Sequence, residues 1–134
     1  AIASRLAAEI YGLDILFESA EDDEHNTTRF LLMSATTSVP AAGGDMITTL
    51  VFQLRSVPAA LYKALGGFAT NGVNLTKLES YIRAGVAEQA QFYMDVQAHI
   101  DDPAMQNAME ELRFYCSKDE VHVLGSYPAS PSRS

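Results

Sequence analysis

The sequence contains a single cysteine, Cys116, among its 134 residues. One cysteine cannot form a disulfide within the chain, and this favours a reducing compartment, so we expect a cytoplasmic protein. Basic residues are also few, because nine Lys and Arg against 17 Asp and Glu give a formal net charge of −8. A surface of this sign repels nucleic-acid phosphates, so we expect no nucleic-acid partner. The sequence also lacks an apolar run of membrane-spanning length and a signal peptide, which predicts no membrane association.

The acidic residues and histidines of the sequence do not have the spacing of a metal-binding motif. The acidic run 21–25 (EDDEH) lacks the alternation and the central glycine of an EF-hand loop, so we interpret it as a solvated loop. Metal-ligand spacing is equally absent from the three histidines, His25, His99 and His122. We therefore expect no metal and no other cofactor, and we interpret Cys116 as a small packing residue rather than a nucleophile.

The first third of the chain predicts one helix and two short strands. Apolar residues recur four apart within residues 1–11, which indicates a helix, and residues 13–18 and 28–35 have the composition of strands. The chain starts without an initiator Met and with this helix already under way, which suggests a fragment of a longer protein. Residues 36–45 are small, polar and rich in Gly and Pro, so we place a domain boundary in this linker.

Beyond the linker, strand and helix patterns alternate in a regular order. The order strand, helix, strand, strand, helix, strand is typical of the ferredoxin-like α+β fold, an antiparallel sheet with two helices on one face. Composition predicts a disordered tail over residues 129–134. We expect strands at 46–56, 73–82, 89–100 and 121–127, and helices at 58–72 and 101–116.

The junction between the first of these strands and its helix has features suited to binding an anion. A helix start offers unpaired N–H groups and a partial positive charge, and the small side chains of Ala59 and Ala60 leave this backbone open. Asn74, on what we expect to be the neighbouring parallel strand, could donate to a carboxylate or accept from an ammonium group. Such a combination suits a zwitterionic amino acid. From these residues alone, an ordinary helix start with packing alanines remains the favoured interpretation.

Residues 56–80, SVPAALYKALGGFATNGVNLTKLES, resemble the ligand-binding half of an ACT domain of the kind attached to prephenate dehydratase. That family carries a Gly-Ala-Leu-Val type motif at the helix start and a Glu-Ser-Arg-Pro motif in the following strand. The resemblance implies that residues 46–128 bind L-phenylalanine at an interface between two ACT domains, in a homodimer or tetramer. The implied effector-binding residues are Pro58, Ala59, Ala60, Leu61, Tyr62, Asn74, Leu75, Glu79 and Ser80.

The chain departs from both family motifs. Ala59 stands where the first motif has glycine, which adds a methyl group where the ligand backbone approaches. Tyr81 and Ile82 stand where the second motif has Arg and Pro, so that motif is half present. Weak feedback control or a changed ligand preference is therefore an open alternative.

Residues 1–34 resemble the closing segment of the prephenate dehydratase catalytic domain, whose Thr-Arg-Phe motif falls on Thr28, Arg29 and Phe30. The resemblance implies that these three residues are catalytic. The Thr28 hydroxyl would help the ring hydroxyl of the substrate to leave, and the Arg29 guanidinium would pair with a substrate carboxylate. The implied substrate-binding residues are Ser4, Asn26 and Thr27.

The resemblance as a whole implies the C-terminal part of prephenate dehydratase, the lyase that converts prephenate into phenylpyruvate, carbon dioxide and water in phenylalanine biosynthesis. Residues 1–40 would be a helix-strand fragment of its α/β catalytic domain with the linker, and the ACT domain would sense L-phenylalanine. We expect the chain alone to be inactive. The alternative is a stand-alone amino-acid-binding ACT module without a catalytic role. A third class, an RNA-binding sheet of the same architecture, is disfavoured by the negative charge.

Overall fold

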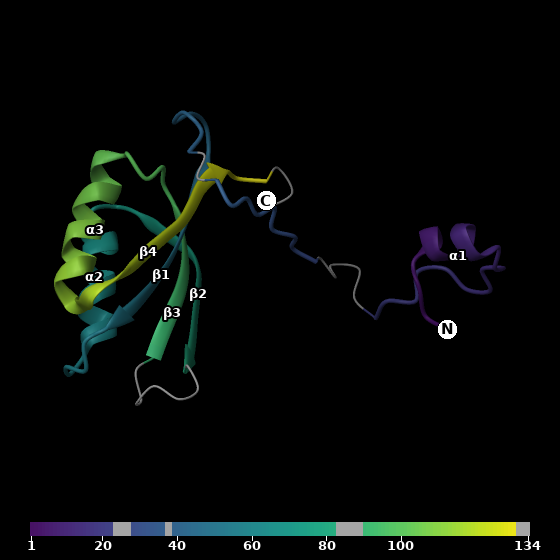
Figure 1. Cartoon of the computed structure of the whole chain (residues 1–134), viewed down its shortest axis with the longest axis horizontal. Coiled ribbons are helices and arrows are strands. Elements are labelled where there is room, and N and C mark those ends of the chain that lie inside the picture. Colours follow the sequence, from purple (N-terminus) through teal and green to yellow (C-terminus); the bar gives the residue numbers. More distant parts are fainter. Residues whose placement is uncertain (23–27, 37–38, 83–89, 131–134) are drawn as a thin grey trace. The chain divides into compact units, whose positions relative to one another are not determined.

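A computed structural model describes residues 1–22, 28–36, 39–82 and 90–130 of the chain (Figure 1). The chain divides into two compact units, residues 1–34 and residues 35–134, and each is described by itself. Within the described ranges, no helix combines the length and the apolar character needed to cross a membrane.

The first unit contains the short helix α1 (Arg5–Tyr11). The Ser4 hydroxyl caps its start by accepting a hydrogen bond from the Ala7 N–H at 3.2 Å. Gly12 ends it in the left-handed conformation (φ 61°), and the Gly12 N–H donates to the Ala8 carbonyl. The helix predicted over residues 1–11 is therefore confirmed from Arg5 onward.

The two strands predicted at residues 13–18 and 28–35 are wrong, because the described residues there form no strand. Their apolar side chains are exposed, among them Leu16 at 96% and Phe30 at 87%. An extended segment becomes a strand only when a neighbour takes up its backbone hydrogen bonds, and the described part of this unit offers no such neighbour. An apolar run indicates a preference for burial, but it does not supply the partner.

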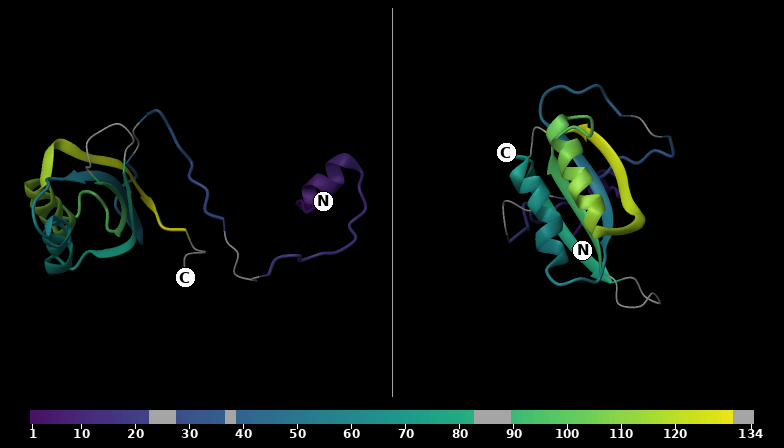
Figure 2. Two further views of the ribbon diagram at one scale, coloured as in Figure 1. Left: turned by 90° about the horizontal axis from the view of Figure 1, so that it is seen from below. Right: turned by 90° about the vertical axis from the view of Figure 1, so that its left-hand side faces the viewer.

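The second unit is a four-stranded sheet with two helices, in the predicted order, and it confirms the ferredoxin-like fold. All neighbouring strands are antiparallel, and their order across the sheet is β2-β3-β1-β4. Both helices cover the same face of the sheet, where they lie side by side (Figure 2). The elements are β1 (Met46–Leu54), α2 (Ala60–Thr70), β2 (Asn74–Ile82), β3 (Ala90–Gln97), α3 (Pro103–Tyr115) and β4 (Cys116–Pro128).

The position of β2 differs from the prediction that places it beside β1. β3 lies between them and pairs with both, for example through Leu50 opposite Met94 and Leu78 opposite Met94. The reason is that β2 and β3 are consecutive and antiparallel, so β3 returns along β2 and occupies the position next to β1. β1 and β2 are parallel in direction but are not neighbours.

The last strand is longer than predicted, since β4 begins at Cys116, directly after α3, rather than at residue 121. Cys116 pairs with Leu54 at the end of β1, and the ladder shifts register between Phe52 and Leu54. Asp119 adopts a left-handed backbone (φ 60°) in this stretch. The sequence 116–120 mixes polar and charged residues and has no strand alternation, so the early pairing depends on β1 and not on local preference.

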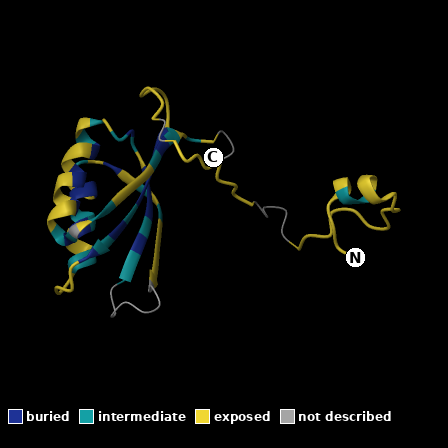
Figure 3. Cartoon of the chain, in the orientation of Figure 1, coloured by how far each residue is buried: buried dark blue, intermediate teal, exposed yellow. Residues whose placement is uncertain are grey.

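The core lies between the sheet and the two helices (Figure 3). Phe52 of β1 and Phe92 of β3 stack with ring centroids 5.3 Å apart. The helix α3 contributes the stripe predicted from its spacing, and all four of its residues are fully buried: Met105, Ala108, Met109 and Leu112.

Cys116 belongs to the same core, with 5% of its surface exposed. Burial raises the pKa of the Cys116 thiol from 9.0 to about 11, and the Arg55 charge opposes this rise. The thiol is therefore protonated at neutral pH, as suits a packing residue and not a nucleophile. Its favourable contribution to stability is present below pH 9 and is lost as the pH rises toward 11.

The contact between α2 and α3 generates a prediction about two adjacent glycines. A methyl group on Gly67 would lie 2.7 Å from the Glu111 Cβ, an atom fixed to the α3 backbone, whereas a methyl group on Gly66 would meet nothing within 4 Å. We expect Gly67→Ala to lower the free energy of unfolding by about 1–3 kcal/mol, because the helices must move apart. The control Gly66→Ala should raise it by up to about 1 kcal/mol through helix propensity. Urea unfolding of both variants measures this, and equal effects would contradict the close helix contact.

Candidate functional site

The helix α2 begins with an open N-terminus. Its N-cap residue, Ala59, adopts φ 57° and ψ 28°, and no side chain caps the first turn. The Ala60 N–H donates to the Val57 carbonyl at 3.1 Å. For the N–H groups of Leu61 and Tyr62, the described residues provide no acceptor. Two donors and the positive end of the helix dipole are therefore available to an anion such as a carboxylate.

The left-handed Ala59 explains why α2 begins at residue 60 rather than at the predicted residue 58. A left-handed residue interrupts the helical backbone, so Pro58 precedes the helix instead of forming its first turn. This conformation costs an alanine about 1–2 kcal/mol more than a glycine. Glycine is the residue of the resembling motif at this position, so the departure at Ala59 adds backbone strain as well as a methyl group.

The loop before α2 is held by Arg55, a residue that the sequence analysis missed. The Arg55 N–H donates to the Tyr115 carbonyl at 3.0 Å, and its side-chain Nη2 donates to the Phe114 carbonyl. Its guanidinium also lies 5.4 Å from the centroid of the Phe114 ring. These contacts join the end of β1 to the end of α3 and fix the loop that leads to the open helix start. Arg55 lies outside both motifs, so the sequence carries no signal for this role.

Some side chains near the open turn pack against the core, and others are exposed to solvent. Leu61 and Leu75 are partly buried and pack against the hydrophobic core, so they support the site from beneath. Pro58 is exposed, and Tyr62 is 82% exposed. The backbone of this turn and the exposed side chains of Pro58, Ala59 and Tyr62 are accessible to a ligand.

Asn74 lies at the opposite end of α2 from the open turn. The helix has 11 residues and is therefore about 16 Å long, and Asn74 begins the strand that follows it. The Asn74 Nδ2 donates to Gln97 Oε1 at 2.6 Å, which leaves its carbonyl oxygen to accept. One copy of the chain thus does not bring Asn74 together with Ala59–Leu61, in contrast to the cradle predicted from neighbouring strands.

The remaining predicted effector residues are on β2, which runs back in the direction opposite to α2. Glu79 forms an ion pair with Lys77, with 3.1 Å between Lys77 Nζ and Glu79 Oε1. Lys77 Nζ also lies 5.1 Å from the centroid of the Tyr93 ring. Ser80 is exposed on the same edge strand. These side chains are accessible, and β2 has a free edge within the sheet.

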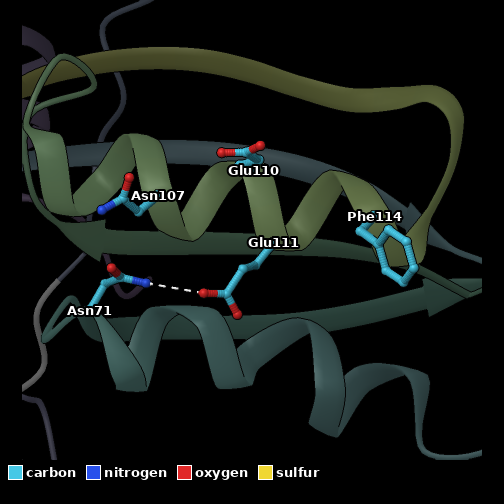
Figure 4. Close-up of a pocket in the computed structure, with 5 residues that line it drawn as sticks. All are labelled: Asn71, Asn107, Glu110, Glu111 and Phe114. Carbon is cyan, nitrogen blue, oxygen red and sulfur yellow. Dashed lines mark hydrogen bonds between the residues drawn. The ribbon is translucent and has the colours of Figure 1, made fainter.

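A shallow hollow between α2 and α3 contains none of the predicted effector residues. It is lined by Asn71, Asn107, Glu110, Glu111 and Phe114, and the Asn71 Nδ2 donates to Glu111 Oε1 at 3.3 Å (Figure 4). In the described ranges, no group of three or more His, Cys, Asp or Glu side chains is placed to hold a metal ion.

The predicted catalytic residues Thr28, Arg29 and Phe30 are exposed and lie in irregular backbone of the first unit. Ser4, a predicted substrate contact, has its hydroxyl engaged as the cap of α1. Asn26 and Thr27 lie outside the described residues. The described part of this unit buries no residue. It has a hollow lined by residues between Ala1 and Glu21, which includes Ser4 but not Thr28, Arg29 or Phe30, so the predicted catalytic residues and Ser4 are not brought into one pocket. The roles of these residues stay predictions.

Comparison with known proteins identifies the family. A family model described as prephenate dehydratase matches residues 1–38. A bifunctional N-acyl-homoserine lactone acylase/prephenate dehydratase of Komagataeibacter europaeus is 49% identical over 99% of this chain and 47% of its own length. The chain belongs to the prephenate dehydratase family. A bifunctional chorismate mutase/prephenate dehydratase of Stutzerimonas stutzeri is 36% identical over 96% of this chain and 34% of its own length. The chain thus spans less than half the length of the curated relatives it matches.

Two solved structures share the fold. The quorum-quenching acylase GqqA is 46% identical with a TM-score of 0.66, over 73% of this chain and 50% of that one. The prephenate dehydratase of Arthrobacter aurescens, solved in complex with L-Phe, is 29% identical with a TM-score of 0.62. That match covers 70% of this chain and 30% of the other.

The strain at Ala59 generates a second prediction. We expect Ala59→Gly to raise the free energy of unfolding by up to about 1 kcal/mol, because glycine adopts a positive φ without steric cost. The matched control is Ala69→Gly, in the exposed last turn of α2, which should lower it by up to about 1 kcal/mol. Thermal and urea unfolding distinguish the two. Destabilisation by both changes would mean that Ala59 is not left-handed in solution.

Proposed function

We propose that the chain is the C-terminal part of a prephenate dehydratase and that residues 46–128 form an ACT domain that binds L-phenylalanine. The observation that carries this proposal is the uncapped first turn of α2, with two backbone N–H groups that have no acceptor among the described residues. The relative solved in complex with L-Phe supports the choice of ligand. The single cysteine is consistent with a cytoplasmic location.

The chemistry of a zwitterionic ligand matches the two ends of α2. Its carboxylate would accept hydrogen bonds from the N–H groups of Leu61 and Tyr62 at the positive end of the helix. Its ammonium group would donate to the carbonyl oxygen of Asn74, whose Nδ2 is held by Gln97. Glu79 and Ser80 would contact the ligand from β2.

The distance between these groups implies that the ligand binds between two copies. About 16 Å separates the ends of α2, which exceeds the reach of an amino acid, so one molecule of ligand cannot bridge them within one chain. An α2 start from one copy and Asn74 from its partner can face the same ligand. We therefore propose a homodimer, or a tetramer built from such dimers, in which the ligand stabilises the interface.

The catalytic role that we propose belongs to the first unit as part of a larger domain. Thr28 would donate a hydrogen bond to the ring hydroxyl of prephenate as it leaves, while Arg29 pairs with a carboxylate. The substrate would also be contacted by Phe30, Ser4, Asn26 and Thr27. Because the described residues of this unit form no core, the 134-residue chain alone should not turn over prephenate.

Binding of the proposed effector can be measured directly. We expect isothermal titration calorimetry to detect L-phenylalanine binding to the chain, with weaker binding of tyrosine and tryptophan. Asn74→Ala should weaken it, whereas Asn107→Ala, an exposed amide on α3, should not. The sedimentation coefficient should rise with saturation if the ligand binds between copies. Absence of phenylalanine binding to the unchanged chain would overturn the proposed function.

Catalysis is tested in the longer dehydratase that the proposal implies. Thr28→Ala should reduce kcat for phenylpyruvate formation by about 10²- to 10⁴-fold, the usual contribution of a positioned proton donor. Thr28→Ser keeps the hydroxyl and should retain most of the activity. The alternative is a stand-alone sensing module, which the separate core of the second unit favours. Under this alternative, Thr28→Ala does not change the rate of phenylpyruvate formation.

A further inference from the structure

The loop between β3 and α3, residues 98–102, is hydrogen-bonded to both β1 and β4. The Thr48 hydroxyl donates to the Ala98 carbonyl at 2.7 Å, and the Ile100 N–H donates to the Ser126 hydroxyl at 3.3 Å. Thr48 and Ser126 also bond to each other, with 3.0 Å between their oxygens. The loop is therefore fixed to the start of β1 and to the end of β4.

His99 lies at the centre of this loop and both of its ring nitrogens are engaged. The side chain is 3% exposed. Its Nδ1 accepts from the Asp101 N–H at 3.1 Å, so the proton of the neutral ring must be on Nε2. The Nε2–H therefore donates to the Pro40 carbonyl, 2.9 Å away. A buried side chain thus holds one backbone oxygen of the linker that precedes the module.

Few other hydrogen bonds hold residues 39–45 of this linker. The Ala129 N–H donates to the Asp45 carbonyl at 2.8 Å, immediately before β1. Between residues 39 and 44, the bond from His99 is the one hydrogen bond recorded among the described residues. These linker residues are exposed. A segment with exposed backbone and one anchoring bond opens at low free-energy cost, so the His99–Pro40 bond decides whether the linker is docked.

The same loop is connected to the proposed effector site. Gln97, the last residue of β3, accepts the hydrogen bond from Asn74 Nδ2 at 2.6 Å, and His99 follows two residues later. The Ala98 N–H donates to the Val96 carbonyl at 3.1 Å, which closes a tight turn centred on Gln97. The Asn74 side chain is therefore connected to His99 by one side-chain hydrogen bond and two peptide units.

We propose that His99 is a latch for the linker, and that the Asn74–Gln97 contact couples this latch to the effector site. The proposed effect of ligand on the latch rests on the proposed function, because it requires Asn74 to contact the ligand. In the docked state, His99 binds Pro40 and the linker follows the module. In the released state, the bond is broken and residues 39–44 move freely. Ligand that engages Asn74 shifts the balance between these two states, so occupancy of the second unit changes the tether of the first.

The latch is tested first without any ligand, by NMR of the whole chain. In the unchanged protein, the ¹⁵N shifts of His99 should show a protonated Nε2 and an accepting Nδ1. Order parameters of the Ala41–Gly44 amides should fall below about 0.6 in His99→Ala, as expected for released backbone. Equal order in the unchanged chain and a folded His99→Ala variant would overturn the latch.

The coupling is tested with two matched surface changes on β3. Gln97→Ala removes the contact with Asn74, while Gln91→Ala removes the same type of side chain at the other end of the strand. We expect Gln97→Ala, but not Gln91→Ala, to shift the His99 ring resonances and to lower the linker order parameters. If the two variants behave alike, the coupling is overturned. This comparison does not require His99→Ala to fold. If His99→Ala fails to fold, order parameters of the Ala41–Gly44 amides that are already below about 0.6 in the unchanged chain would overturn the latch.

Addition of L-phenylalanine separates this inference from the proposed function. Binding that also changes the His99 and linker signals supports the coupling, and Gln97→Ala should then alter the dissociation constant about 5-fold or more, since linkage is reciprocal. Phenylalanine binding without any change in the His99 and linker signals overturns the coupling. If phenylalanine does not bind, the proposed function fails, while the ligand-free comparison of Gln97→Ala with Gln91→Ala still decides on the coupling and the His99→Ala comparison still decides on the latch.

Discussion

The second unit depends on the placement of β3 between β1 and β2. One face of β3 supplies Phe92, Met94 and Val96 to the core beneath the helices. The other face carries Asp95, fully buried, whose Oδ1 accepts from the Thr49 hydroxyl at 2.6 Å. A buried carboxylate is tolerated only with such hydrogen bonds, so this pair fixes the register of β3 against β1. The remaining features of the module follow from where β3 begins and ends.

The same placement determines the geometry of the proposed effector site. Because β1 and β2 are both antiparallel to β3, they run in the same direction, so the helix α2 must carry the chain from one end of the sheet to the other before β2 begins. The open turn at Ala59 and the amide of Asn74 are therefore at opposite ends of α2. A site that uses both requires a second copy, and this makes ligand binding and association parts of one equilibrium. The end of β3 brings Gln97 to Asn74 and His99 to the linker, so the same strand connects that site to the tether.

The two units differ in how far they bury their apolar side chains. The second unit buries Phe52, Phe68 and the α3 stripe around one core. The described residues of the first unit bury none, although they include Leu16, Phe17 and Phe30. Exposed apolar surface of this extent favours association with further protein. This contrast supports the proposal that catalysis requires residues outside this chain, whereas sensing does not.

Local preferences in the sequence determined the order of elements and the buried stripe of α3, because hydrophobic periodicity and turn chemistry are encoded within short windows, whereas the left-handed Ala59 and the helix start at residue 60 were not expected from them. The family motifs indicated the residues of both candidate sites. The tertiary structure decided which strands are neighbours, how early β4 begins, the distance between Asn74 and the open turn, and the roles of Arg55 and His99. It also removed the strands expected at 13–18 and 28–35. These properties depend on partners distant in sequence, since a strand, a bridging arginine or a buried histidine is defined by the backbone group that it meets, and no local pattern specifies that group.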